Sequence, residues 1–266
     1  MLEIIRPRPG TRPRVALLDF DGTLSLVRGG WQQIMQGLML DALRPLATHE
    51  PQDALAARVA DAIDRLTGHP TLAQMEWLRA EVLRRGGCPD SADSYKRRYL
   101  ELLDARVASR LGALRTGRAV PDDLLVPGSR ALLEGLRDAG TLLVLASGTD
   151  LVDVRREAEA LQITDFFGPH IYGPGPHDPA FTKRTVIDRL LAELGLGGHE
   201  LLAIGDGPVE IRETRAVSGV TVGVALDELR GAGLDHAKRE RLIAAGADVI
   251  VADLTPVDAL LGHLLG

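Results

Sequence analysis

The 266-residue chain has little cysteine and few aromatic side chains. Its single cysteine, Cys88, cannot form an intramolecular disulfide, which fits a reducing compartment, and we expect a cytoplasmic protein. The seven histidines are scattered, so no Cys/His group has zinc-site spacing. Aromatic content of 3% and a net charge of −6 both disfavour a nucleic-acid-binding surface. We therefore expect neither a nucleic-acid partner nor a structural zinc site.

Long apolar runs are also missing. No run approaches the roughly 20 residues that a membrane span requires, so we expect no membrane partner. The N-terminal segment 2–5 is too short for the core of a signal peptide. It precedes a basic, proline-rich arm at residues 6–14, which we expect to be a flexible leader.

The overall composition, with 45% hydrophobic and 26% charged residues, is typical of a soluble globular enzyme. Short apolar runs alternate with amphipathic segments, which predicts a doubly wound, Rossmann-like α/β core with a parallel sheet. After a first strand at 15–18, the predicted strands are 141–146, 170–172, 201–204, 220–225 and 247–251. The predicted helices between and after them are 128–139, 151–161, 183–194, 209–217 and 235–245.

Residues 25–120 follow a different pattern. They contain helix-like stretches at 31–43, 52–66, 72–85 and 91–111, with no convincing strand. We predict that residues 1–24 and 121–266 form the α/β core. Residues 25–120 are then an inserted helical domain, reached through linkers near 25–30 and 116–127.

Two carboxylates follow the first predicted strand. Asp19 and Asp21 stand two residues apart at its end, and Gly22 permits a sharp turn. Like charges at this spacing need a cation or a shared proton, so the pair suits a divalent metal beside a carboxylate nucleophile. The alternative is an Asp-Gly turn with solvated acids.

Ser147 and Gly148 follow the strand at 141–146 and open a helix, a position that favours phosphate binding. Helix capping by Thr149 or Asp150 is compatible with this interpretation and would leave Ser147 free. Lys183 is one of three lysines and begins a helix, where a cation opposes the helix dipole. A buried anionic partner would explain its position; a solvated surface lysine is the alternative.

Asp206 follows the strand at 201–204, and Glu210 stands four residues later at the opening of a helix. Two acids in such a loop suit a hard cation. Alternatively, Glu210 only complements the helix N-terminus. Because strand ends in a doubly wound sheet meet at one crevice, we expect Asp19, Asp21, Ser147 and Asp206 to converge there.

These four segments, in this order, resemble the motifs of the haloacid dehalogenase superfamily, in its phosphatase branch. The resemblance covers nearly the whole chain and implies that the helical insert is the cap domain of that family. Many relatives carry Asp where this chain has Glu210. The longer side chain favours a water-mediated or second-shell contact with the metal.

The resemblance implies a mechanism for phosphomonoesters. Asp19 would be the nucleophile, and Asp21 the general acid and base. Mg²⁺ would be held by Asp19, Asp206 and the backbone carbonyl of Asp21. Ser147, Gly148 and Lys183 would bind the phosphoryl oxygens. Asp21 argues against dehalogenases and phosphonate hydrolases, which lack a carboxylate at that position.

The substrate is expected to be a small phosphomonoester, such as a sugar or polyol phosphate. A phosphomutase of the β-phosphoglucomutase kind and a non-catalytic binding module are the alternatives. Candidate substrate residues in and near the cap are Arg28, Trp31, Thr71 and Gln74. We expect segment 67–71 to be a plain helix connection with Thr71 as N-cap, with contact to the substrate as the alternative. We expect a monomer or a homodimer.

Overall fold

The computed structural model describes residues 1–7, 10–46, 50–67, 70–175, 181–228 and 230–266. The chain divides into two compact units, one formed by Met1–Gly29 with Arg110–Gly266 and the other by Gly30–Ser109. The second boundary lies inside a long helix, α4 (Ala92–Arg115). No helix among the described residues is long and apolar enough to cross a membrane.

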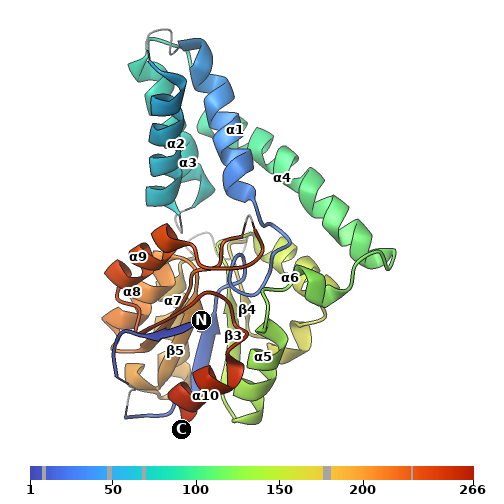
Figure 1. Ribbon diagram of the computed structural model, residues 1–266, viewed down its shortest axis with the longest axis vertical. Helices are drawn as coiled ribbons and strands as arrows, with labels where there is room; N and C mark the ends of the chain where they lie inside the picture. Colours follow the sequence, from blue (N-terminus) through green and yellow to red (C-terminus); the bar gives the residue numbers. More distant parts are fainter. Residues whose placement is uncertain (8–9, 47–49, 68–69, 176–180, 229) are drawn as a thin grey trace. The chain divides into compact units, whose positions relative to one another are not determined.

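The first unit is built on a sheet, of which Figure 1 labels β3, β4 and β5. Its strand order is β1-β7-β6-β5-β2-β3-β4. All of its pairs are parallel except β1 with β7. The mostly parallel sheet confirms the predicted α/β class. The strands are β1 (Leu2–Ile4), β2 (Val15–Leu18), β3 (Leu142–Ala146), β4 (Ile171–Tyr172), β5 (Leu201–Gly205), β6 (Val220–Val224) and β7 (Val249–Val251).

Helices cover the sheet because its central strands are apolar on both faces. Every side chain of β2 is fully buried. One face packs against Val186, Ile187 and Leu190 of helix α7. The helices of this unit are α5 (Ser129–Asp138), α6 (Leu151–Ala160), α7 (Lys183–Leu194), α8 (Pro208–Ala216), α9 (His236–Ala245) and α10 (Val257–Leu265), with short 3-10 turns at Pro121–Leu124, Thr164–Phe166 and Gly198–Glu200.

The register of the central strands brings their carboxyl ends together. Leu18 of β2 pairs with Leu145 of β3 on one side and with Ile204 of β5 on the other. The residues that follow these three strands therefore emerge at the same edge of the sheet. This edge carries three of the four sequence segments that predicted the chemistry, and the fourth, Lys183, begins helix α7.

The expectation of a flexible leader at residues 6–14 is wrong for the part of this arm that the structure describes, and the strand before it is ordered as well. Residues 2–4 form the antiparallel edge strand β1 against β7, and Glu3 pairs with Arg239 of α9. The arm that follows is also attached, because Arg12 donates to the carbonyl of Ala139 and the Arg14 amide donates to that of Glu200. Since the Arg6 amide also donates to the carbonyl of Asp248, both described ends of the arm are hydrogen-bonded to the core.

The second unit is helical, as the sequence predicts. It contains α1 (Trp31–Leu43), a 3-10 turn (Arg44–Leu46), α2 (Gln52–Leu66), α3 (Thr71–Arg84) and most of α4. The N-cap position of α3 is occupied by Pro70, so the expectation that Thr71 is the N-cap is wrong. Of the predicted connection 67–71, Gly68 and His69 lie outside the described residues. The assignment of this unit as a cap remains a prediction.

Candidate active site

Asp19 emerges directly after β2, where its amide donates to the carbonyl of Ile204. Its carboxylate is mostly buried, and Oδ1 lies 2.7 Å from Nζ of Lys183. Burial raises the pKa of Asp19 well above its usual range, against the opposing effect of Lys183. The alternative of a solvated Asp-Gly turn is therefore wrong for this residue.

Lys183 is the first residue of α7, and its side chain is 10% exposed. Besides Asp19, its Nζ donates to Oε2 of Glu210 at 2.8 Å. Burial opposes the charge of the ammonium, but the two carboxylates raise its pKa above the ordinary value. Carboxylate partners thus explain why a cation is tolerated at a helix N-terminus, and the surface-lysine alternative is wrong.

Glu210 has two separate contacts, one for each carboxylate oxygen. Oε1 accepts a hydrogen bond from the Gly207 amide at 2.8 Å and so caps α8, while Oε2 accepts from Lys183. Helix capping is therefore only half of its role. Gly205 makes this possible, since a Cβ at that position would lie 2.1 Å from Oε1.

Asp206 follows β5 and lies close to the turn at Gly22. A Cβ on Gly22 would stand 2.3 Å from Oδ2 of Asp206, and the backbone of Gly22 has a φ of +75°. Only glycine satisfies both conditions without strain. Ligand oxygens of Asp19, Asp206 and Glu210 all lie within 4.8 Å of one another, which is the geometry of a group that could hold a metal ion.

Asp21 is oriented by two hydroxyl groups of the segment that follows β3. Its Oδ2 accepts hydrogen bonds from Oγ1 of Thr149 at 2.8 Å and from Oγ of Ser147 at 3.4 Å. Oδ1 is buried and has no hydrogen-bond partner among the described residues. Burial raises the pKa of Asp21, opposed by the charge of Arg28.

The predicted capping by Thr149 or Asp150 is wrong. Asp150 occupies the N-cap position of α6 without a side-chain hydrogen bond, and the hydroxyl of Thr149 contacts Asp21 instead. Ser147 is not free either, because its Oγ accepts from the Thr149 amide at 3.0 Å. Gly148 is exposed, with no atom within 4 Å of the position that a Cβ would take.

A second lysine belongs to this cluster, although no sequence motif indicated it. Nζ of Lys238, at the start of α9, donates to Oδ2 of Asp206 at 2.9 Å and to Oε1 of Glu228 at 2.8 Å. Lys238 is 4% exposed. Burial opposes its charge, but the two acids raise its pKa. The scarcity of lysine was the one available signal for Lys238; nothing singled out Glu228.

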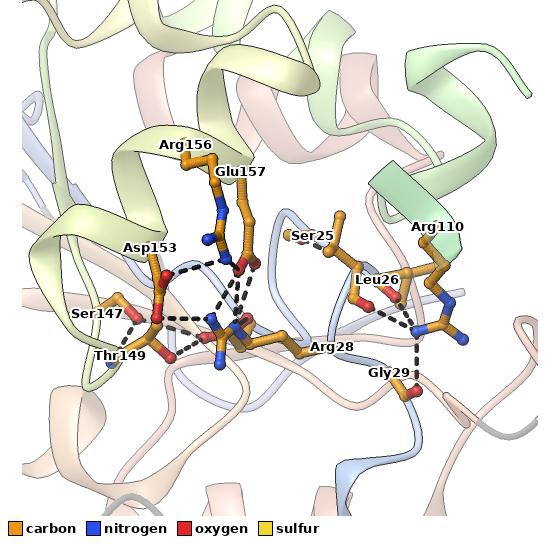
Figure 2. Close-up of polar contacts among 12 residues, drawn as sticks. Ser25, Leu26, Arg28, Gly29, Arg110, Ser147, Thr149, Asp153, Arg156 and Glu157 are labelled. Atoms are coloured by element: carbon orange, nitrogen blue, oxygen red, sulfur yellow. Dashed lines mark hydrogen bonds and ion pairs between the residues drawn. The ribbon is translucent and has the colours of Figure 1, made fainter. Parts of the chain in front are cut away.

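Arg28 is buried and contacts two acidic side chains of helix α6. Figure 2 shows its guanidinium against Glu157 and Asp153, with Arg156 on the far side of the two acids. Burial raises the pKa of Glu157 to about 7, against the opposing effect of Arg28. Trp31, Thr71 and the buried Gln74 lie in the helical unit. Their role toward a substrate remains a prediction.

The fold is a mostly parallel α/β sheet with acidic residues at the carboxyl ends of its strands, and the family can now be stated. A family model described as haloacid dehalogenase-like hydrolase matches residues 13–217. The chain therefore belongs to the haloacid dehalogenase-like hydrolases. A comparison with curated protein sequences found no match.

Solved structures share the fold across almost the whole chain. A haloacid dehalogenase-like protein of unknown function from Agrobacterium tumefaciens has a TM-score of 0.62 at 18% identity, covering 95% of this chain and 99% of its own. A predicted phosphoglycolate phosphatase from Haemophilus somnus has a TM-score of 0.61 at 16% identity, covering 94% and 99%. A haloacid dehalogenase family hydrolase from Deinococcus radiodurans, with bound phosphate and sodium, has a TM-score of 0.58 at 18% identity. The match covers 96% of this chain and 98% of that chain.

Proposed function

We propose that this chain is a Mg²⁺-dependent phosphatase that hydrolyses a small phosphorylated metabolite, such as a sugar or polyol phosphate, through an aspartyl-phosphate. The observation that carries the proposal is the contact of Lys183 with both Asp19 and Glu210, at 2.7 and 2.8 Å. A buried ammonium beside a strand-end carboxylate can neutralise an incoming phosphate dianion while leaving the second carboxylate oxygen of Asp19 for attack.

The donor set near Asp19 fits a hard divalent cation. Asp19 and Asp206 offer carboxylate oxygens, and the backbone carbonyl of Asp21 lies in the same loop. Both carboxylate oxygens of Glu210 already accept hydrogen bonds, from Lys183 and from the Gly207 amide, which supports a water-mediated role in place of a direct bond. When bound, Mg²⁺ would supply charge neutralisation for the phosphoryl oxygens.

Asp19 forms the covalent bond to phosphorus, and Asp21 transfers the proton. An oxygen of Asp19 attacks phosphorus, and the bond from phosphorus to the ester oxygen breaks as Asp21 gives its proton to the departing alkoxide. Water then attacks the phosphorus of the aspartyl-phosphate, Asp21 takes a proton from that water, and the Asp19 carboxylate is regenerated. Ser147, the Gly148 amide and Lys183 are proposed to hold the phosphoryl oxygens throughout.

The arrangement around Asp21 supports its role as acid and base. Thr149 and Ser147 bind one carboxylate oxygen, so the other oxygen is left to exchange a proton with the leaving group. A halide would need no proton. Hydrolysis of a phosphate ester is therefore the reaction that uses this carboxylate.

A substrate screen tests the proposal. Purified protein with Mg²⁺ is incubated with a panel of sugar, polyol and aryl phosphates, and release of inorganic phosphate is measured. We expect turnover of at least one ester. Asp19→Asn should lower it by about 10,000-fold or more, because an amide cannot act as the nucleophile, while the circular dichroism spectrum stays unchanged. Asp188→Asn, an exposed carboxylate on α7, is the control.

Three outcomes would overturn parts of this proposal. Full activity of Asp19→Asn would remove the nucleophile assignment. Isomerised sugar phosphate in the presence of a bisphosphate primer, without free phosphate, would indicate the phosphomutase. Inactivity on every ester and with every divalent metal would indicate a non-catalytic phosphometabolite-binding module.

A further inference from the structure

Arg28 is a buried arginine whose Nε and Nη2 already contact carboxylates. Nε lies 3.1 and 3.2 Å from the two oxygens of Glu157, and Nη2 lies 2.7 Å from Oε1 of the same carboxylate. Nη2 also lies 3.3 Å from Oδ2 of Asp153. The paired geometry is that of a fork meeting a carboxylate, which fixes the plane of the guanidinium.

Glu157 has no solvent exposure, although it stands in the middle of helix α6. A fully buried carboxylate is costly, and a cation with matching hydrogen bonds is what makes it tolerable. The same helix begins directly after Ser147, Gly148 and Thr149. Glu157 therefore connects Arg28 to helix α6, which follows the segment that contains Ser147 and Thr149.

The backbone on either side of Arg28 is also fixed. Nη1 of Arg110 donates to the carbonyls of Leu26, Val27 and Gly29, at 2.8, 2.7 and 2.9 Å (Figure 2). Thus Arg110 holds the main chain, and Glu157 holds the head group. An arginine restrained at both ends has little freedom to reach elsewhere.

What this restrained guanidinium faces is Asp21. Its Nε lies 4.0 Å from Oδ1 of Asp21, the oxygen that has no hydrogen-bond partner among the described residues. The other oxygen is held by Thr149 and Ser147 from the start of α6. Arg28 is therefore close enough to attract Oδ1 by charge, yet too far away to occupy it with a hydrogen bond.

We propose that Arg28, held by Glu157, is a positioning residue that orients Asp21 toward the leaving group of the substrate. This inference deepens and rests on the proposed phosphatase function, and it assigns Arg28 a role that does not require contact with the substrate. Glu157 acts only through Arg28. Arg156, which contacts Asp153 and Glu157 but is not in contact with Asp21, has no such role.

The test compares two esters that differ in their need for a proton. An alkyl phosphate requires protonation of its leaving group by Asp21, whereas p-nitrophenyl phosphate has a leaving group stable without it. The variants are Arg28→Met, Glu157→Gln and the double variant, with Arg156→Met as the control on the same helix. We measure kcat/KM, which includes the step that expels the alcohol, and KM separately.

For Arg28→Met we expect kcat/KM to fall by about 100-fold on the alkyl ester and by only a few-fold on the aryl ester, with KM nearly unchanged. Glu157→Gln should also lower kcat/KM more on the alkyl ester than on the aryl ester, but by a smaller factor than Arg28→Met. The double variant should be no worse than Arg28→Met, because both changes interrupt one interaction. It also removes both buried charges, so it keeps the test decisive if Arg28→Met fails to fold.

Equal losses on the two esters would overturn the inference in favour of a scaffold role. A raised KM with retained kcat would overturn it in favour of substrate binding. Additive losses in the double variant would separate Glu157 from Arg28 and contradict the coupling. Inactivity of the wild-type protein on both esters would instead count against the proposed function itself.

Discussion

Lys238 shows how a single side chain can change the electrostatics of a site. The described cluster around Asp19 contains several carboxylates, and two ammonium groups lie among them, Lys183 beside Asp19 and Lys238 beside Asp206. Like charges at this density raise each other's free energy when buried. Lys238 therefore compensates Asp206 and Glu228 in the absence of a cation.

Replacement of Lys238 by Met should destabilise the metal-free protein. Asp206 and Glu228 would lose the ammonium group that both contact, so the free energy of unfolding should fall by about 3 kcal/mol. Urea unfolding in EDTA measures this. The deficit should shrink in excess Mg²⁺, because a bound cation restores positive charge beside Asp206. Lys96→Met, in helix α4, is the control, and a Lys238→Met protein as stable as wild type in EDTA would contradict the argument.

Helix α6 carries two kinds of information at the scale of the element. Its apolar residues Val154 and Ala158 are buried, as its amphipathic pattern indicates. Glu157 lies between them in sequence and is buried as well, which the pattern does not predict. The Arg28 guanidinium is shared among Glu157, Asp153 and Asp21, so it offsets only part of the cost of burying this carboxylate.

The buried carboxylate of α6 should leave a pH signature in stability. The pKa of Glu157 is about 7 in the folded protein, above the ordinary value of 4.5. Folding therefore takes up a proton between these two pH values, and the stability that Glu157 contributes is lost as pH rises from about 4.5 to about 7. The wild-type protein should lose more stability than Glu157→Gln across this window.

Urea unfolding at several pH values between 4.5 and 8, with EDTA present, measures the difference. Glu159→Gln, an exposed carboxylate on the same helix, is the control for the loss of one charge. If the wild-type protein instead gained stability relative to Glu157→Gln as pH rises, the charge of Arg28 would outweigh the burial of Glu157. That outcome would mean that folding lowers the pKa of Glu157 below its ordinary value.

Most elements were predictable because their hydrophobic periodicity is strong. Helices α1, α2 and α7 have the bounds that the sequence predicts, and strands β3 to β6 each differ by one residue. Strand β1 was missed because its three residues are too few to show alternation, and Ile4 is exposed. Its pairing with β7, 245 or more residues away along the chain, is a tertiary contact without a local signal. Helix α10 (Val257–Leu265) was also missed.

At the scale of the whole molecule, the proposed chemistry needs a divalent cation. Removal of metal by EDTA should abolish phosphate release, and Mg²⁺ in excess should restore it, since Asp19, Asp206 and the Asp21 loop then regain their counter-charge. Mg²⁺ should also raise the melting temperature of the wild-type protein, because a ligand that binds the folded state stabilises it.

A matched NaCl addition controls for ionic strength in that experiment. Asp206→Asn should abolish the rise in melting temperature, which gives a readout that does not depend on activity. Undiminished turnover in excess EDTA would count decisively against the metal-dependent mechanism. An equal rise in melting temperature for wild type and Asp206→Asn would place the cation elsewhere.

The sequence by itself determined the α/β class and the position of Asp19, Asp21, Ser147 and Asp206 at strand ends, because apolar periodicity and the residues after each strand are local properties. Only the tertiary structure decided which groups these residues meet. Thr149 contacts Asp21 in place of capping its helix, Lys238 pairs with Asp206, and Glu157 holds Arg28. Such pairings join residues up to 129 positions apart, and their geometry depends on strand register and burial, which no local pattern specifies.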